Sequence, residues 1–547
     1  MNLGQFFEHW GIVENPFRGE EARHDTVFAR LSAEPDTSNA ATPAPTSTTT
    51  PTSTPTPTTT TGPTPTPTQA RHSDFEKILG DLARPSTSIV FGEKGSGKTA
   101  LRLQIEARVR THNRQRPQER VLLIAHDDLN AALDRFHERS GLGGDRAAPG
   151  SPIESLRHFR LVDHIDAMLL WAVPRLVDAL LEESPAGAAG AIDIGESGRK
   201  ALRRLDGAAR RDLLLLQAVY DRPEMAHART VRLRSALRLP IGGGRRAWDA
   251  LLFAGWLLPV AVLLGWWQVG TLPDSVWWVL LAAAALAWAA GAFKRLALDR
   301  LAMQRLARKV RKQVRVTGRT EASYAQSLGQ LEPALASPAS LPTTDADDSR
   351  YALLERLRRV LAPLGYRGVL IVIDRVDEPS LISGNPEAMR ALIWPLLSNK
   401  FLQMEGVGVK MLLPIELRHA LYRESSAFFQ EARLDKQNLV DRLSWTGAML
   451  YDLCDARLKA CLAPGASHID LVDLFAEDVT ERDIVDALDQ MHQPRDAFKF
   501  LYQCLSEHCS NVTAGQQAWR VPRLVLEGVR KQQSERVQQL YRGISPA

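Results

Sequence analysis

The chain has 547 residues, of which 44% are hydrophobic and 24% are charged, and its formal net charge is +5 at pH 7. This length predicts roughly three to four domain-sized units. So mild a positive charge does not support nucleic-acid binding by itself. The four cysteines form no Cys-x-x-Cys pair, which argues against a zinc site of standard spacing.

The N-terminal arm, residues 1–33, contains an aromatic stretch around a turn at Asn15 and Pro16. Its aromatic side chains need burial. The stretch resembles the aromatic-Gly-x(3)-Asn-Pro-Phe arm of several bacterial P-loop ATPases, such as the secretion ATPase A type. Two roles stay open, a cap over the base of a nucleotide or a plain arm packed on the core. Residues 34–71 are almost entirely Thr, Pro, Ser and Ala, which predicts a disordered tether.

Residues 72–128 are predicted to form the first half of a nucleotide-binding core, organised around the sequence Gly-Glu-Lys-Gly-Ser-Gly-Lys-Thr. An apolar stretch precedes this loop and a helical pattern follows, which is the order that a phosphate-binding loop requires. Its glycines let backbone N–H groups converge on phosphates at a helix N-terminus. We expect the lysine to reach the β- and γ-phosphates of ATP and the threonine to ligate Mg²⁺. The residues concerned are Gly92, Gly95, Gly97, Lys98 and Thr99.

Residues 129–244 are predicted to be a helical insert, because several of their segments have an amphipathic helical pattern. A break at residues 186–190 is rich in Ala and Gly.

Residues 245–295 are predicted to form a transmembrane hairpin. The two uncharged apolar runs, residues 250–267 and 276–293, have about the minimum length of a bilayer-spanning helix. Basic pairs flank the hairpin on both outer sides, and tryptophans lie at its turn, which predicts a cytoplasmic-membrane protein with both flanks in the cytoplasm. A pair of buried core helices is the alternative. Neither run contains a charged residue, which disfavours a transporter or channel.

Residues 296–350 are predicted to be a basic juxtamembrane helix followed by a linker from Thr317 onward. Three interpretations stay open for the basic residues on both sides of the hairpin, which are Arg229, Arg232, Arg234 and Arg238 before it and Lys294, Arg295, Arg300, Arg305, Arg308, Lys309, Arg311, Lys312 and Arg315 after it. The interpretations are the ordinary positive-inside bias, contact with anionic lipid headgroups, and nucleic-acid binding. The third is disfavoured because no aromatic residues interleave with the basic ones.

Residues 351–425 are predicted to complete the core. The apolar run at 368–373 indicates a central parallel strand. An acid at the carboxyl end of such a strand lies beside the phosphate loop, so we expect Asp374 to hold Mg²⁺. Asp377 and Glu378 follow, where they could polarise a water that attacks the γ-phosphate.

The sequence Asp-Arg-Val-Asp-Glu at 374–378 resembles the Asp-x-hydrophobic-Asp-Glu motif of STAND (NACHT-like) ATPases, which are relatives of the AAA+ class. An apolar hairpin between two nucleotide motifs is similar to the KAP family of membrane P-loop ATPases, although that family usually has Asp-Asp-Leu-Asp-Arg here. The resemblance implies a three-layer α/β P-loop core with ATP and Mg²⁺ as cofactors. Arg375 stands where many AAA+ proteins carry the catalytic glutamate, which leaves the identity of the base open.

Residues 426–547 are predicted to be a helical lid, with a winged-helix-like tail from residue 516 as a further possibility. By the same resemblance, Arg433 and Arg442 are candidates for fingers that reach a γ-phosphate in a neighbouring subunit, which implies a homo-oligomer. Arg495, in a Pro-Arg pair that is well placed to begin a helix, is either a sensor of the phosphates or part of a plain helix start. Only Glu416 could act as a polar sensor after the strand at 407–414.

The sequence therefore predicts a membrane-anchored P-loop ATPase that binds, and hydrolyses, ATP with Mg²⁺ on the cytoplasmic side to drive conformational change or assembly. A slow nucleotide-gated switch or scaffold in signalling or defence is the alternative, and a DNA-stimulated ATPase is a weaker one. Its protein target does not follow from the sequence.

Overall fold

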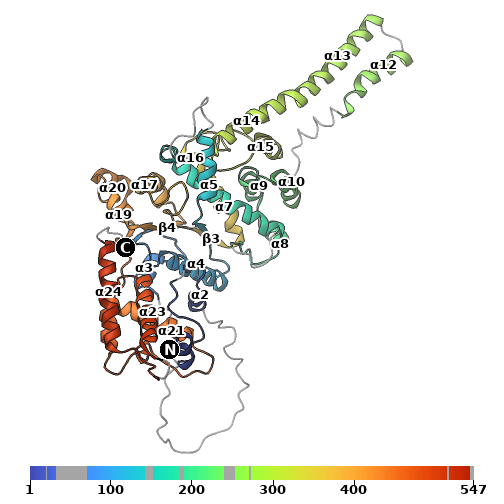
Figure 1. Ribbon diagram of the computed structural model, residues 1–547. Coiled ribbons are helices and arrows are strands. Elements are labelled where there is room, and N and C mark those ends of the chain that lie inside the picture. Colours follow the sequence, from blue (N-terminus) through green and yellow to red (C-terminus); the bar gives the residue numbers. More distant parts are fainter. Residues whose placement is uncertain are drawn as a thin grey trace, which may run out of the picture.

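A five-stranded parallel sheet lies at the centre of the computed structural model, which describes residues 1–19, 21–32, 71–141, 152–183, 190–239, 253–269, 273–513 and 516–541 (Figure 1). The strand order is β2-β3-β4-β1-β5. Nearly all of the predicted tether and most of the predicted break at 186–190 lie outside the described residues. The strands are β1 Ser88–Gly92, β2 Arg120–His126, β3 Tyr366–Ile373, β4 Val407–Pro414 and β5 Asn438–Val440.

Helices cover both faces of the sheet, because its strands are apolar on both sides. Val90 of β1 packs into a cluster with α3 (Phe75–Leu79) and α4 (Lys98–Gln115). Its neighbours Ile89 and Phe91 point to the opposite face, into a larger cluster built by the helical insert. The fold is thus mixed α/β, as predicted, with its sheet between two helical layers.

The edge strand β5 corrects the predicted domain boundary. It lies within residues 426–547, the range predicted to be a helical lid, yet it pairs in parallel with β1. The sheet therefore extends past residue 425. The other four strands, β1 to β4, coincide with apolar stretches of the sequence and pair in parallel with one another.

The helical insert is built around α7 (Leu161–Leu181), which is buried along most of its length, because apolar residues occupy most of its surface and its buried acids are paired. Residues 317–350, predicted to be a linker, belong to the same body. Arg319, Tyr324 and Leu328 are buried there, and the segment includes the helix α15. The surrounding helices are α5 Asn130–Gly141, α6 Pro152–Leu156, α8 Gly198–Arg204, α9 Gly207–Tyr220, α10 Ala226–Ala236, α15 Glu321–Leu328, α16 Asp347–Leu361 and α17 Pro386–Ile393.

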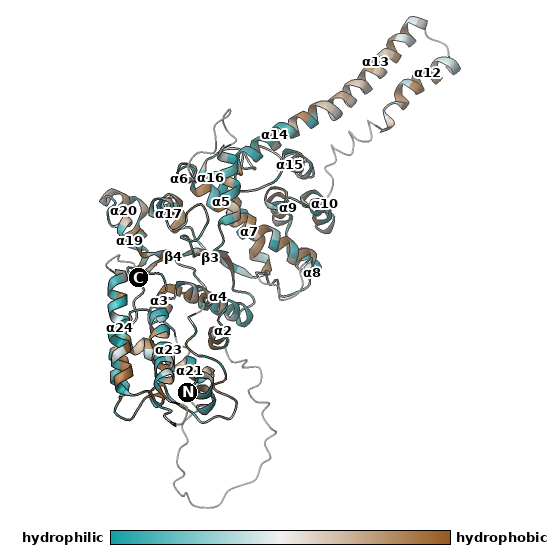
Figure 2. Cartoon of the chain, in the orientation of Figure 1, coloured by the Kyte–Doolittle hydropathy of each residue, from teal (hydrophilic) through white to brown (hydrophobic). Residues whose placement is uncertain are grey.

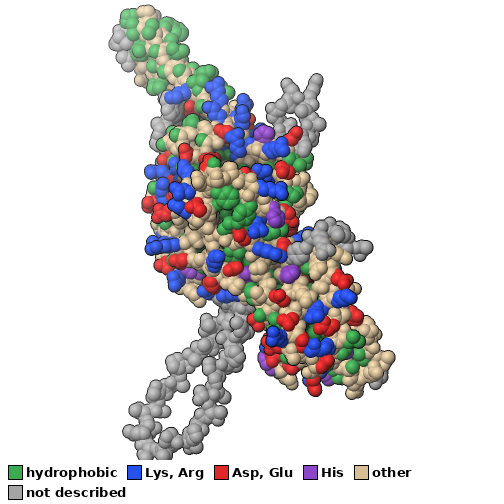
Figure 3. All heavy atoms as spheres, turned by 90° about the vertical axis from the view of Figure 1, so that its left-hand side faces the viewer, with side chains coloured by type: hydrophobic (Ala, Val, Ile, Leu, Met, Phe, Trp, Pro, Cys, Tyr) green, Lys and Arg blue, Asp and Glu red, His purple; other side chains and the backbone are tan. Residues whose placement is uncertain are grey.

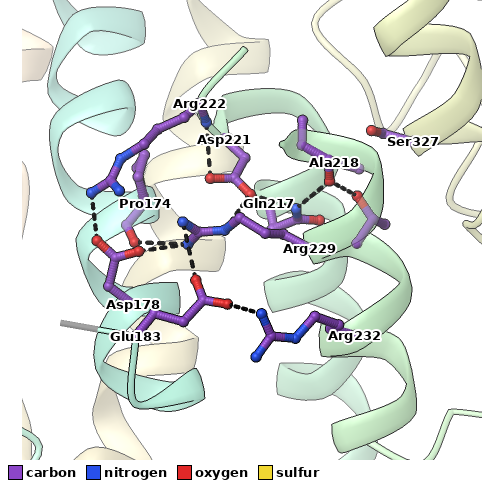
Figure 4. Close-up of polar contacts among 12 residues, drawn as sticks. Pro174, Asp178, Glu183, Gln217, Ala218, Asp221, Arg222, Arg229, Arg232 and Ser327 are labelled. Carbon is purple, nitrogen blue, oxygen red and sulfur yellow. Dashed lines mark hydrogen bonds and ion pairs between the residues drawn. The ribbon is translucent and has the colours of Figure 1, made fainter. Parts of the chain in front are cut away.

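A network of ion pairs joins the C-terminal end of α7 to α10 (Figure 4). Arg229 of α10 reaches Asp178 of α7 at 2.7 Å, Glu183 at 3.3 Å and Asp221 at 3.1 Å. Asp178 also pairs with Arg222, and Glu183 with Arg232, each at 2.5 Å. The network fixes α10, the last described helix before the apolar segment, to the core of the insert.

The apolar segment projects from the body as two helices, α12 (Leu257–Val269) and α13 (Asp274–Phe293) (Figures 1 and 2). They touch through Trp266 and Trp278, whose ring centroids are 5.5 Å apart. Within the described residues, Ser275–Phe293 is the one helix long and apolar enough to cross a membrane, and none of it is buried.

The first apolar run differs from its prediction as a complete spanning helix. The chain turns at residues 255–256 and α12 begins at Leu257, two residues before Pro259. Proline is tolerated in a first helical turn, because its missing N–H has no partner there. Its position therefore fits a helix that begins at Leu257. Residues 250–252 lie outside the described part of the chain.

A third body combines the two ends of the chain. Phe6, Ile12 and Phe17 of the N-terminal arm pack into one cluster with the C-terminal helices. The predicted winged-helix-like tail is wrong for the described residues, because residues 516–541 contain one long helix, α24, and a single bridge to Phe475 in place of a strand pair. The helices of this body are α1 Leu3–His9, α2 Thr26–Ser32, α21 Gly447–Ala460, α22 Glu481–Asp489, α23 Pro494–Asn511 and α24 Arg523–Tyr541.

Candidate nucleotide site

The predicted phosphate loop connects the carboxyl end of β1 to the first turn of α4. Two of its glycines have left-handed backbones, with φ of 104° at Gly95 and 93° at Gly97, where a side chain would be strained. A Cβ on Gly95 would lie 2.8 Å from the side-chain oxygen of Gln493. The loop therefore requires glycine for its shape and for the close approach of the C-terminal body.

Lys98 begins α4 and folds back over this loop. Its Nζ donates hydrogen bonds to the carbonyl oxygens of Gly92 at 2.8 Å and Glu93 at 2.9 Å. Burial lowers the pKa of Lys98, and the carboxylates of Asp374, Asp377 and Glu416 oppose that shift. The ammonium group thus lies among carboxylates and backbone carbonyls, positioned where an anion at the helix N-terminus would compete for it.

Asp374 follows β3 at the same edge of the sheet, as predicted from parallel strands. It is 1% exposed, and neither carboxylate oxygen has a hydrogen bond of good geometry, although the Thr99 side chain and the backbone N–H of Arg375 lie close enough to act on its pKa. Arg102 of α4 lies 3.4 Å from it, and burial is the main reason that its pKa is raised. A buried carboxylate without hydrogen bonds of good geometry is costly, and a divalent cation would remove that cost.

Arg102 is a residue of the site that no sequence motif selects. It is 5% exposed and also lies 3.3 Å from Asp127 and beside Glu106, so it neutralises acids from α4, from the end of β2 and from the end of β3. An arginine four positions after the loop lysine is ordinary on a helix, and only its burial reveals the role.

The two acids after Asp374 have different surroundings. Glu378 forms an ion pair with Arg375, whose backbone has a left-handed φ of 59°. Asp377 lies close enough to Lys98 to influence its pKa. Glu378, one of the two acids that could polarise the attacking water, is therefore held by an arginine of its own turn, and freeing it requires breaking that pair.

The two candidate finger arginines, Arg433 and Arg442, lie in different surroundings. Arg442 forms an ion pair with Glu93 of the phosphate loop at 2.7 Å, so the structure places it beside the loop of its own chain. Arg433 is exposed at a turn with φ of 52°. Glu416 lies in the first turn of α19 (Ile415–Leu421) at the end of β4, where its negative charge raises the pKa of Lys98 against the effect of burial.

A cavity of about 210 Å³ brings four parts of the chain together. The phosphate loop, the turn after β3, the N-terminal arm and the C-terminal body all line it. Arg495 is among the lining residues, close to Gly95. The arm contributes Asp25 and Phe28, so it both packs on the C-terminal body and covers the cavity.

The C-terminal body holds the phosphate loop directly. The indole N–H of Trp445 donates to the carbonyl of Ser96 at 2.9 Å, and Gln493 donates to the carboxylate of Glu93. The sequence motif did not predict these contacts, because their residues lie far apart in the chain and carry no pattern of their own.

Comparisons with protein-family models, curated proteins and solved structures find no match for this chain. No group of three or more His, Cys, Asp or Glu residues in the described part could hold a metal ion by itself. A cation at Asp374 would need ligands from outside the protein, as it has in nucleotide sites that supply phosphate oxygens.

A buried histidine pair lies behind the site. His126 ends β2, its ring lies 3.5 Å from that of His164 of α7, and burial lowers the pKa values to about 4 and about 3. Both rings are thus neutral in the folded chain near pH 7. The unfolded chain binds protons below about pH 6.5, so stability is full above that pH and falls as the pH drops towards 4.

We predict that His126→Asn reduces this loss of stability on acidification. Complete titration of His126 alone corresponds to about 3 kcal/mol, since each pKa unit is worth about 1.4 kcal/mol. Thermal unfolding midpoints between pH 7 and 4.5 test this, with His419→Asn as the control at a histidine outside the pair. Parallel pH curves for the wild type and His126→Asn would contradict it.

Proposed function

We propose that this protein binds ATP with Mg²⁺ in the cavity and uses the bound state to change its conformation or assembly at a membrane. The observation that carries the proposal is Asp374, a 1%-exposed carboxylate that faces Arg102 at 3.4 Å but has no geometrically good hydrogen bond, beside a glycine-rich loop and a helix N-terminus. A buried carboxylate normally has hydrogen bonds as well as a charge partner, and a divalent cation would supply ligand bonds in their place.

The residues present fit such a ligand. Backbone N–H groups of the loop and the N-terminus of α4 would receive the phosphates, and Lys98 would exchange its two loop carbonyls for phosphate oxygens. Thr99 and Asp374 would hold Mg²⁺, which supplies charge neutralisation on the phosphates. Arg495 lines the cavity where it could sense the same charge.

The apolar helices support the proposed membrane anchor. The spanning candidate has 19 residues, which is about 29 Å of helix and close to the thickness of a bilayer's hydrocarbon core. Trp267 and Leu286 are 82% and 72% exposed, an arrangement that water disfavours and lipid favours. Figure 3 displays the apolar projection with Lys and Arg side chains around its base.

A slow nucleotide-gated switch is favoured over a fast enzyme by the ion pair between Arg375 and Glu378. A carboxylate held by an arginine must leave that ion pair before it can orient an attacking water. This agrees with the resemblance to KAP- and STAND-type ATPases. Assembly of several copies is part of the proposal, with the exposed Arg433 as the candidate for a residue that acts on a neighbour.

Nucleotide binding tests the first part. We expect Lys98→Ala to weaken ATP binding at least about ten-fold, and Asp374→Asn to remove the difference in affinity between Mg²⁺ and EDTA, since the carboxylate is the cation's protein anchor. The measurement is a titration with a fluorescent ATP analogue, with Lys77→Ala on the surface as control. Equal affinity in all four proteins would refute the site.

Turnover tests the switch. We expect slow hydrolysis by the wild type, an increase of about ten-fold or more in Arg375→Ala, and loss of activity in Glu378→Gln, since a positioned general base contributes about 10²–10⁴-fold. Phosphate release under saturating ATP measures this, and Arg367→Ala, at the far end of β3, is the control. If Arg375→Ala is no faster than wild type, the ion pair does not limit turnover.

Membrane extraction tests the anchor. We expect the full chain to stay with the membrane fraction through high-salt and alkaline carbonate washes and to be released by detergent, because the apolar helices are held by lipid and not by charge. Replacing residues 253–293 with a Gly/Ser linker should make the protein soluble. Release of the full chain by carbonate would exclude insertion.

A further inference from the structure

A second pocket, with a volume of about 760 Å³, opens between α8, α9 and α10, away from the nucleotide cavity. We call it the arginine pocket, because five arginines line it and no carboxylate of the described residues does. The arginines are Arg199, Arg203, Arg210, Arg232 and Arg238.

Most of this charge is not compensated inside the protein. Arg232 pairs with Glu183, which Arg229 shares, so that part of the network in Figure 4 is balanced. For the other four arginines no ion pair is recorded among the described residues. Four guanidinium groups around one space repel each other, and an anion would relieve that repulsion.

Arg210 is the least satisfied of them. Its terminal nitrogens make two long hydrogen bonds, at 3.4 Å to the carbonyl oxygens of Leu237 and Arg203. Its Nε is buried and has no partner. An arginine offers five donors in a planar fork, and this one has donors left for a ligand that brings acceptors.

The floor of the arginine pocket is apolar, with Leu202 and Leu237 buried beneath the charged rim. The pocket lies on α10, the last described helix before the apolar helices, on the side of the body from which the chain runs towards α12 (Figure 1). An apolar floor under a cationic rim fits a ligand that carries phosphate and some hydrocarbon.

We propose that the arginine pocket binds a phosphate-bearing anion, either the headgroup of an anionic phospholipid or a free polyphosphate. Guanidinium forks recognise phosphate oxygens in a bidentate way, and several converge here. This site goes beyond the proposed nucleotide function and does not depend on it, since it shares no residue with the nucleotide cavity.

The test compares two variants of the full chain, purified in neutral detergent. Both carry Lys98→Ala, which weakens phosphate binding in the nucleotide cavity, and each carries two further arginine substitutions. Arg203→Gln with Arg210→Gln removes two arginines of the pocket. Arg204→Gln with Arg211→Gln makes the same change of charge at adjacent positions of α8 and α9 that do not line it and that pair with Glu196 and Glu332. Calorimetric titrations use inorganic tripolyphosphate in one arm, and short-chain phosphatidylglycerol against short-chain phosphatidylcholine in the other.

We expect the pocket variant to bind one of the two anions at least about ten-fold more weakly than the control variant, which should bind like its Lys98→Ala parent. Loss confined to tripolyphosphate identifies a soluble ligand, and loss confined to phosphatidylglycerol identifies a lipid headgroup. Equal weakening in both variants, or no binding of either anion by the parent, would overturn the proposal. Equal unfolding midpoints of the two variants establish that folding is not the cause of a difference.

Discussion

Three buried carboxylates of α7 form ion pairs that connect this helix to three distant segments of the chain. Asp163, Asp166 and Asp178 are at most 3% exposed, and each faces an arginine that comes from a distant segment. Burial raises the pKa of Asp163 to about 6 and that of Asp166 above its usual range, while the arginines oppose both shifts. Removing one partner of such a buried pair typically costs about 3–5 kcal/mol of stability. Detaching a segment that supplies one of the arginines from α7 would therefore be strongly unfavourable.

The arginines come from the segments on both sides of the apolar helices and from the segment that leads into β3. Arg229 lies on α10, before the apolar helices, and Arg315 follows α14 (Asp299–Gln313), which continues the line of α13 through η2 (Lys294–Leu298). Arg350 lies on α16, which leads into β3 and so to Asp374. The N-terminal part of α7 contacts the sheet edge through His164. Through these ion pairs, α7 connects the segments before α12 and after α13 to β3, which Asp374 follows.

The sequence predicted the elements that depend on interactions between residues close together in the chain. Continuous apolar runs marked β3 and β4, and the glycine spacing marked the phosphate loop with its helix. By contrast, β5 has three residues, two of them half-buried, which is too short for a pattern. Residues 317–350 contain turn-forming residues that suggested a linker, but Arg319 is buried and donates to the carbonyl of Ala218 at 2.6 Å, a contact that no local pattern reveals.

The contacts that hold the phosphate loop give the site a way to communicate with the C-terminal body. Glu93 is bound by Arg442 and Gln493, the carbonyl of Ser96 by Trp445, and the side chain of Lys98 by loop carbonyls. A phosphate that recruits Lys98 and the loop amides must therefore compete with, or rearrange, the same short segment that the C-terminal body grips. If phosphate binds this loop, a ligand that prefers one loop geometry would bias the position of the body, and the body's position would change the ligand's affinity by the same factor.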